Sequence, residues 1–193
     1  MAQGLAMSKK PSAPGSPQDG RVRLEAIKAL REKTSASLND VRAALESAGG
    51  DEAKALELLR QRGLAIAEKR QGRATGHGRI ESYIHHNGLL GALVEIDCET
   101  DFVARTEDFV TFCRDVAMQV AAMSPRYVRP EDVPSTERLS AEQLKEACLL
   151  EQPFVRDQQA AVKDLLKAFI AKTGENVVIR RFMRFTIGES PAT

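Results

Sequence analysis

The sequence predicts an α+β protein, in which a three-helix bundle precedes a small antiparallel sheet packed against helices. Three observations support this fold class. Apolar residues recur at the helical spacing of three and four within residues 22–62. Two strand-like segments, residues 79–86 and 89–98, flank an Asn-Gly pair that is typical of a hairpin turn. A third alternating segment, residues 176–187, follows only after a long helical stretch, which favours α+β over a parallel α/β fold.

The composition argues against several classes of protein. The chain has 193 residues and a net charge of +1, so no global charge attracts it to nucleic acid or to an anionic membrane. No apolar run approaches the ~20 residues of a membrane span, and no signal peptide opens the sequence. The prediction is a cytoplasmic protein of one or two small domains.

The cysteines and histidines predict neither a disulfide scaffold nor a metal site. Cys98, Cys113 and Cys148 are an odd, widely spaced set without a Cys-x-x-Cys pair, so we expect buried free thiols. His85 and His86 are expected on opposite faces of a strand, where they cannot share a metal ion. No residue pair has the sequence context of a nucleophile, and no phosphate-binding loop motif is present. We therefore predict a protein that is not an enzyme and needs no metal or other cofactor.

The N-terminal part is predicted to contain a tail and the helical bundle. Residues 1–20 are rich in Gly and Pro and poor in large apolar side chains, which predicts disorder. Residues 21–62 are predicted to form the three helices. Ser37 is expected to cap the second helix together with Asp40. A Gly-Gly pair stops that helix, and Asp51 places an acid at the start of the third.

A basic connector follows, predicted as a linker over residues 63–78. Between residues 60 and 79, six Lys and Arg residues accompany a single acid. Nucleic-acid binding is an alternative for such a segment, but no aromatic residue interleaves the cations to stack on bases. A solvated linker is therefore the favoured interpretation.

Residues 79–188 are predicted to form the α+β core domain, and residues 189–193 a short tail. The Asn87-Gly88 pair is expected to make a two-residue type I′ turn between the first two strands. Helices are expected in three segments: residues 107–123, a short helix that starts at a capping box of Ser140 with Gln143 and runs through residue 150, and residues 158–172.

The last strand, residues 176–187, is expected to place one alternating row of apolar side chains on one face. The members of this row are Val177, Ile179, Met183, Phe185 and Ile187. Arg181 interrupts the row.

The turn after the second strand carries the strongest functional signal. Thr100, Asp101, Phe102 and Val103 place an acid and a large aromatic ring side by side in a polar segment. An exposed Phe contributes nothing to the protein's own core, so insertion into a partner is one interpretation. Packing of Phe102 beneath its own loop is the other.

These residues also resemble a known family. The stretch from Thr100 to Ala104, with residues 94–99 before it, resembles the signature of the elongation factor Ts family. Further segments resemble that family in the family's order: residues 27–34, 48–51, 62–65, 83–87, 149–155 and 174–182. The likeness covers roughly residues 22–188. The sequence has a single copy of the core unit, whereas longer members carry two, so it resembles a short, single-core form.

The resemblance implies a fold and a function. The fold would be a ubiquitin-associated-like bundle followed by the core, or dimerisation, domain of elongation factor Ts, so a homodimer is compatible with it. The partner would be elongation factor Tu, bound both with GDP and without nucleotide. The function would be guanine-nucleotide exchange, in which release of GDP allows reloading with GTP.

The resemblance also implies site residues. Thr100, Asp101, Phe102 and Val103 would insert beside the phosphates bound by elongation factor Tu and dislocate its Mg²⁺. The bundle would contact the same partner through Leu30, Ser37, Leu38 and Asn39, although Asn39 stands where family members commonly have an apolar residue. The alternatives are a ubiquitin-associated-type adaptor, which leaves the Phe102 segment unexplained, and a nucleic-acid-binding module that uses the basic connector.

Overall fold

The computed structural model describes residues 17–34 and 36–189, and it divides the chain into two compact units, Met1–Glu57 and Leu58–Thr193. The predicted disordered tail lies outside the described residues up to residue 16, and its last four residues begin α1 (Pro17–Thr34) instead. The predicted C-terminal tail lies outside the described residues from residue 190 onward.

The first unit contains α1, α2 (Leu38–Ser47) and the start of α3 (Glu52–Arg70). The expected caps are present: the amide of Asp40 donates to Ser37 Oγ at 3.1 Å, and the amides of Ala53 and Lys54 donate to Asp51 Oδ1 at 3.0 and 3.1 Å. The hydrogen bond from the Lys54 amide is the main cause that lowers the pKa of the Asp51 carboxyl. Most of the apolar positions predicted from helical spacing are buried, among them Val41 and Leu45, but Leu38 is 41 % exposed.

The connector is shorter than expected because α3 runs on to Arg70. Residues 63–70 are therefore helical, and β1 (His77–Ile84) begins two residues before the predicted strand. The segment Leu64-Ala65-Ile66-Ala67 consists of adequate helix formers, and Ala67 is buried in the core of the second unit. Basic composition had suggested a linker, but packing along one side of the helix decides the conformation.

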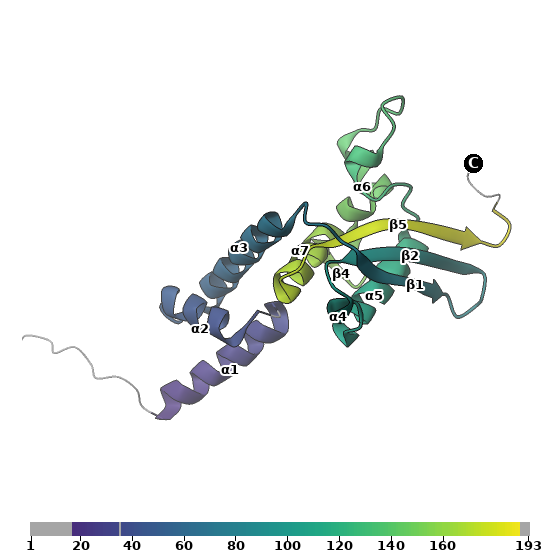
Figure 1. Ribbon diagram of the computed structural model, residues 1–193. Helices are drawn as coiled ribbons and strands as arrows, with labels where there is room; N and C mark the ends of the chain where they lie inside the picture. The colour runs from purple at the N-terminus through teal and green to yellow at the C-terminus, as the bar shows by residue number, and fades with distance from the viewer. Residues whose placement is uncertain (1–16, 35, 190–193) are drawn as a thin grey trace, which may run out of the picture. The chain divides into compact units, whose positions relative to one another are not determined.

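The second unit is built on an antiparallel sheet with strand order β1-β2-β5, as expected for an α+β fold (Figure 1). The other two strands are β2 (Leu90–Cys98) and β5 (Val177–Thr186). The remaining elements are α4 (Asp101–Ala104), α5 (Glu107–Met123), η1 (Pro130–Asp132), α6 (Ala141–Ala147), η2 (Leu149–Glu151), the short hairpin of β3 (Pro153–Phe154) and β4 (Asp157–Ala161), and α7 (Val162–Thr173).

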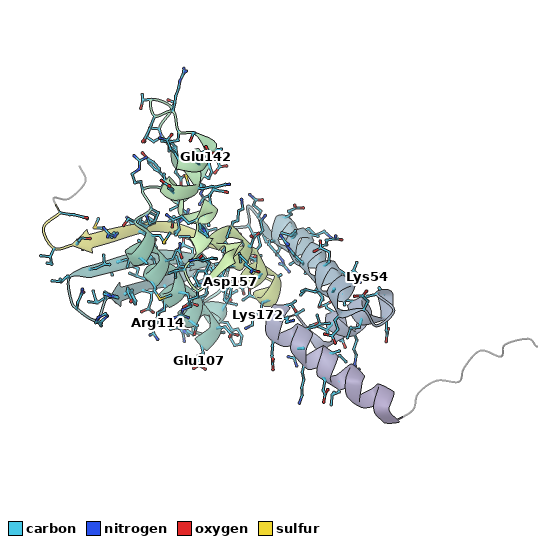
Figure 2. All side chains as sticks on the ribbon, turned by 180° about the vertical axis from the view of Figure 1, so that it is seen from behind. Lys54, Glu107, Arg114, Glu142, Asp157 and Lys172 are labelled. Carbon is cyan, nitrogen blue, oxygen red and sulfur yellow. The ribbon has the colours of Figure 1, made fainter. Side chains whose placement is uncertain are left out.

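The core lies between this sheet and α5, whose bounds match the predicted helix. Ala92, Val94 and Ile96 of β2 face it, as the alternation predicts, together with the apolar side of α5. From α7, Phe169 stacks on Phe112 of α5 with ring centroids 4.6 Å apart. The opposite side of α5 carries exposed charges such as Glu107 and Arg114, labelled in Figure 2.

The hairpin turn between β1 and β2 is not of type I′. That turn requires positive φ at both Asn87 and Gly88, and only Gly88 has it, at 69°. The amide of Gly88 donates to the carbonyl of His85 at 2.8 Å, so the turn spans residues 85–88. Because β1 has already ended at Ile84, strand alternation no longer separates His85 from His86. Their rings lie 4.2 Å apart, and the prediction that they occupy opposite faces is wrong.

Two predicted helices are shorter than expected. The helix predicted over residues 158–172 begins at Val162, because residues 158–161 belong to β4 and Ala161 pairs with Pro153. The helix that starts after the Ser140–Gln143 capping box is present, but it ends at Ala147 and is followed by a single 3₁₀ turn. In both places a non-local backbone partner competes with the helix.

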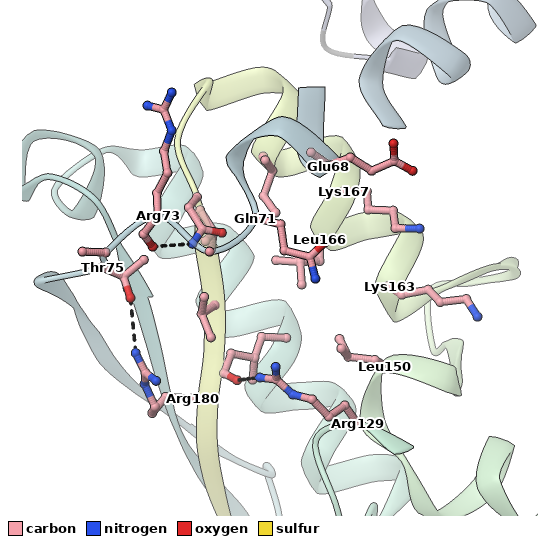
Figure 3. A pocket seen from close by; sticks show the side chains of 18 residues that line it. Glu68, Gln71, Arg73, Thr75, Arg129, Leu150, Lys163, Leu166, Lys167 and Arg180 are labelled. Atoms are coloured by element: carbon pink, nitrogen blue, oxygen red, sulfur yellow. Dashed lines mark hydrogen bonds between the residues drawn. The ribbon is translucent and has the colours of Figure 1, made fainter. Parts of the chain in front are cut away.

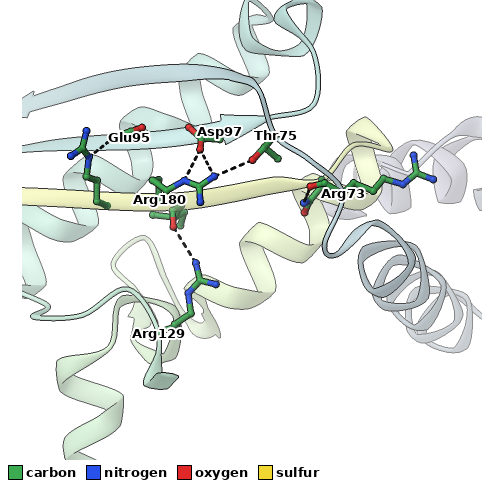
Figure 4. A network of polar contacts seen from close by, with 9 residues as sticks. Arg73, Thr75, Glu95, Asp97, Arg129 and Arg180 are labelled. Atoms are coloured by element: carbon green, nitrogen blue, oxygen red, sulfur yellow. Dashed lines mark hydrogen bonds and ion pairs between the residues drawn. The ribbon is translucent and has the colours of Figure 1, made fainter. Parts of the chain in front are cut away.

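A β-bulge in β5 reverses the face of its second half. Glu95 pairs with Arg181, while the next residue, Ile96, pairs with Ile179, so Arg180 is an extra residue. Figure 4 shows Arg180 reaching Asp97, whose Oδ2 lies 2.7 Å from its Nε, and also Thr75. The interruption that Arg181 makes in the sequence pattern marks this bulge.

Because of the bulge, the prediction that these five apolar residues share one face of the last strand is wrong. Val177 and Ile179, before the bulge, are buried, whereas Met183, Phe185 and Ile187 are 58 %, 55 % and 74 % exposed. Phe182 and Arg184 take the inner face instead: Phe182 packs on the core, and Arg184 Nε donates to the carbonyl of Ala121 at 3.1 Å.

Candidate functional site

The segment that follows β2 is a single helical turn rather than an irregular loop. Thr100 is the N-cap of α4, and its Oγ1 accepts the amide of Val103 at 3.3 Å. Val103 and Ala104 are buried in the core of the second unit. The turn is therefore fixed both by its cap and by the burial of its second half.

The first half of α4 faces solvent. Phe102 is 79 % exposed, so packing beneath its own loop is the wrong interpretation. Asp101 is also exposed, and its carboxylate lies 3.1 Å from the guanidinium of Arg105 one turn later. Of the four residues predicted for this site, the structure presents Thr100, Asp101 and Phe102 outward, while the side chain of Val103 belongs to the core.

The cysteine next to this site is not a nucleophile. The Cys98 thiol is buried and donates to the carbonyl of Thr100 at 3.1 Å. Burial, with a smaller contribution from the Glu175 carboxylate, raises the pKa of Cys98 to about 11. Burial likewise raises the pKa of Cys113 to about 12. At neutral pH these thiols are protonated and inert.

The predicted contact residues of the bundle separate into two groups. Ser37, Leu38 and Asn39 are exposed where α2 begins, and Leu38 has 41 % of its surface accessible. Leu30 is only 2 % exposed, so its side chain serves the folding of the N-terminal helices rather than a partner surface. All four lie in the first unit, and α4 lies in the second.

A cavity of about 740 Å³ opens in the second unit (Figure 3). Several cations line it, but most have an acidic partner. The nitrogen–oxygen distances of these pairs are 2.7 Å for Arg180–Asp97, 2.6 Å for Lys163–Glu151, 3.5 Å for Arg129–Asp132 and 3.6 Å for Arg73–Glu99. These carboxylates neutralise most of the positive charge that lines the cavity, so the charge does not make the cavity a phosphate cradle.

The sheet has an exposed apolar patch on the face opposite to α5, which we call the outer patch. It consists of Ile84, Leu93, Met183, Phe185 and Ile187, which are at least 43 % exposed. The strand register brings them together, because Leu93 pairs with Met183 and Ile84 lies across Gly91 from Phe185. This surface could not be predicted from strand alternation, because the bulge turns Met183 and Phe185 outward.

Within residues 17–34 and 36–189, every helix is too short or too polar to span a membrane. Nor do these residues bring three or more His, Cys, Asp or Glu side chains together in a way that could hold a metal ion.

Comparison with known proteins gives a consistent result. Residues 24–144 match the family model described as "Elongation factor TS". A protein named elongation factor Ts from Carboxydothermus hydrogenoformans is 49 % identical over 193 residues, covering 86 % of this chain and 89 % of its own length. Proteins of the same name from Rubrobacter xylanophilus and Caldanaerobacter subterraneus are each 46 % identical and cover 98 % and 96 % of their lengths, with 85 % and 86 % of this chain.

Proposed function

We propose, because the chain belongs to the elongation factor Ts family, that it is the guanine-nucleotide exchange factor for elongation factor Tu. It binds elongation factor Tu carrying GDP, accelerates release of GDP, and leaves the nucleotide-free partner ready for GTP. No bond is made or broken in this reaction, so the protein is not an enzyme in the chemical sense. Its place of action is the cytoplasm, where translation takes place.

Exchange of this kind is a linkage between two binding equilibria. A protein that binds the nucleotide-free state more tightly than the GDP state must weaken the affinity of its partner for GDP by the same factor. In the nucleotide pocket the bound Mg²⁺ is the largest local charge, and it holds the phosphates. A side chain that displaces this ion therefore lowers GDP affinity most efficiently.

The exposure of Phe102 is the observation that carries the proposal. A large apolar ring that is 79 % exposed lies on a turn whose next two residues are buried, so the ring is held out on a fixed base. In the proposed complex Phe102 wedges between side chains of elongation factor Tu near the Mg²⁺ and phosphates. Thr100 and Asp101 approach the same place, and Val103 anchors the turn from beneath.

The N-terminal helices make a second contact with elongation factor Tu in this proposal. Ser37, Leu38 and Asn39 supply it from the exposed start of α2, and Leu30 supports them from inside. Asn39 gives this contact a polar group. Because the contact lies in a different unit from α4, we assign it to affinity rather than to the exchange step.

We propose in addition that two copies associate through the outer patch. The chain has one core unit, and an isologous dimer lets the same apolar surface of a second copy cover Met183 and Phe185. Exposed apolar clusters of this kind are typical of protein interfaces. The proposed partners are thus elongation factor Tu and a second copy, with no direct role for nucleic acid or a membrane.

The test is release of fluorescent GDP from preloaded elongation factor Tu, followed by stopped flow at increasing concentrations of this protein. Saturable acceleration, lost in Phe102→Ala, is the expected result. If GDP release is unchanged at all concentrations, the proposed function is wrong. Steeply salt-dependent heparin retention in the same preparation would then favour nucleic-acid binding, and capture on immobilised ubiquitin would favour an adaptor.

A further inference from the structure

The first residue of α4 is held by a carboxylate from a distant part of the chain. The backbone amide of Thr100 donates to Glu175 Oε2 at 3.1 Å, and its hydroxyl donates to Glu175 Oε1 at 2.7 Å. Both carboxylate oxygens are thus engaged by one residue, 75 positions earlier in the sequence. Such paired, charge-assisted hydrogen bonds fix geometry as well as position.

Glu175 itself belongs to a turn that is firmly built into the domain. Gly174 ends α7 in the left-handed conformation, with φ of 69°. Asn176, which follows Glu175, is 5 % exposed, and its amide donates to Glu99 Oε1 at 2.6 Å. Its side-chain Nδ2 donates to the carbonyl of Arg73 at 2.8 Å (Figure 3). The turn therefore links the residues that precede α4 to the chain that leaves α3.

We propose that Glu175 is a positioning residue for nucleotide exchange: it sets the direction in which α4 presents Asp101 and Phe102. This inference rests on the proposed function of α4. Glu175 does not reach elongation factor Tu itself in this account. It acts through Thr100, whose two donors it accepts.

The physical reason is preorganisation. α4 has only four residues and cannot maintain its own orientation, since short isolated helices are marginal in water. Burial of Val103 and Ala104 secures its end, and the Glu175 carboxylate secures its beginning. Without the carboxylate, Phe102 would sample more directions, and this freedom would be lost again at each insertion. Such a cost falls on the exchange step rather than on the encounter with the partner.

The experiment compares Glu175→Ala, Glu175→Gln and the wild-type chain in the stopped-flow assay of GDP release. Glu175→Ala should lower the saturated rate by about three- to tenfold, the range expected for loss of hydrogen bonds to a partly exposed carboxylate. The concentration for half-maximal rate should change less than twofold. Glu175→Gln keeps one acceptor oxygen and should recover part of the rate. Glu151→Ala is the matched control: it removes an ion pair of 2.6 Å with Lys163 elsewhere in the same unit, and it should leave the rate unchanged.

Hydrogen exchange of the free protein gives a readout that does not depend on elongation factor Tu. In Glu175→Ala the amides of residues 100–104 should exchange faster, while those of α5 keep the wild-type rate. Thr100→Val removes the hydroxyl donor of the same contact, together with the cap that Thr100 gives to α4. When it is combined with Glu175→Ala, the losses of saturated rate should be less than additive. This variant also covers the case in which Glu175→Ala fails to fold.

The outcomes separate the two proposals. If Phe102→Ala abolishes exchange while Glu175→Ala and Thr100→Val keep both the wild-type rate and the wild-type amide protection, Glu175 has no positioning role. A rise in half-maximal concentration without a fall in saturated rate would also overturn the inference. If Phe102→Ala itself exchanges at the wild-type rate, the proposed function of α4 fails, whatever Glu175 does.

Discussion

Phe102 and Val103 are neighbours in the sequence but occupy opposite environments: the Phe102 side chain is 79 % exposed and that of Val103 is 7 % exposed. Thr100 caps α4, the helical turn that contains both residues, and successive side chains of a helix are rotated by about 100° from one another. One residue is therefore available to a partner while the next belongs to the core.

This difference predicts separable effects of two substitutions. Phe102→Ala should change the free energy of unfolding by less than ~0.5 kcal/mol, because it removes an exposed side chain. It should nevertheless abolish most of the accelerated GDP release. Val103→Ala should cost about 2 kcal/mol of stability through the cavity that it leaves. Denaturant titration and stopped-flow release measure the two quantities. A Phe102→Ala variant that unfolds readily, or that is folded and fully active, contradicts the proposal.

Asp101 should contribute less than Phe102. Its carboxylate is paired with Arg105 at 3.1 Å, but both groups are exposed, so the pair stabilises the free protein by at most ~1 kcal/mol and is easily released. Asp101→Ala should slow GDP release by a few-fold, and lowering the Mg²⁺ concentration should restore part of the rate. Rates at two Mg²⁺ concentrations check this. An effect of Asp101→Ala that is the same at both would show that Asp101 does not act on the metal.

The contact at the start of α2 should affect affinity. Leu38→Ala should raise the concentration for half-maximal GDP release about fivefold, corresponding to ~1 kcal/mol of binding energy. The saturated rate should stay within twofold. Leu24→Ala is a suitable control, since Leu24 is 55 % exposed in the same unit but lies outside the proposed contact. A collapse of the saturated rate in Leu38→Ala would instead place α2 in the exchange step.

The outer patch predicts a change in oligomeric state. Phe185→Asp places a charge in the centre of the proposed isologous interface, and sedimentation should show that dimers dissociate. Val155→Asp changes another partly exposed apolar residue, outside the patch, and should not alter the sedimentation profile. If the wild-type chain sediments as a monomer at high concentration, the dimer proposal is wrong.

The buried thiols predict a loss of stability at alkaline pH. The pKa of Cys98 is raised to about 11 from an ordinary value of 9.0, so the folded state holds its proton more tightly than the unfolded state does. The stabilisation is complete below about pH 9 and is lost as pH rises toward 11, on the order of 2 kcal/mol. Unfolding titrations between pH 8 and 11 measure this, with Cys98→Ala as the comparison. Equal pH dependence of the two proteins would contradict it.

The order and type of the main elements could be predicted from the sequence alone. Helical spacing identified α2 and α5, strand alternation identified β2, and the capping residues Ser37 and Ser140 marked helix starts that the structure confirms. These features are local: each depends on side chains within a few residues of one another, so their pattern is visible along the chain.

The predicted partner and activity came from the resemblance to a known family rather than from the periodicity of apolar residues. The segment at Phe102 stood out because it lies outside every apolar face, but nothing in its composition names a partner. The family match and the relatives at 44–49 % identity show that the chain belongs to the elongation factor Ts family.

Other features of the protein depend on contacts between residues that are distant in the sequence. The bulge at Arg180, where β5 pairs with β2, turns Phe185 outward, although Phe185 was predicted to share a face with Val177 and Ile179. Burial removes Leu30 from the partner surface, and Glu175 reaches Thr100 across 75 positions of sequence. Local sequence patterns were enough to place most of the main helices and strands, since that choice depends mainly on near neighbours, but several of their ends depend on packing. The face each side chain presents, and the contact that orients α4, depend on register and packing between elements, which no local pattern records.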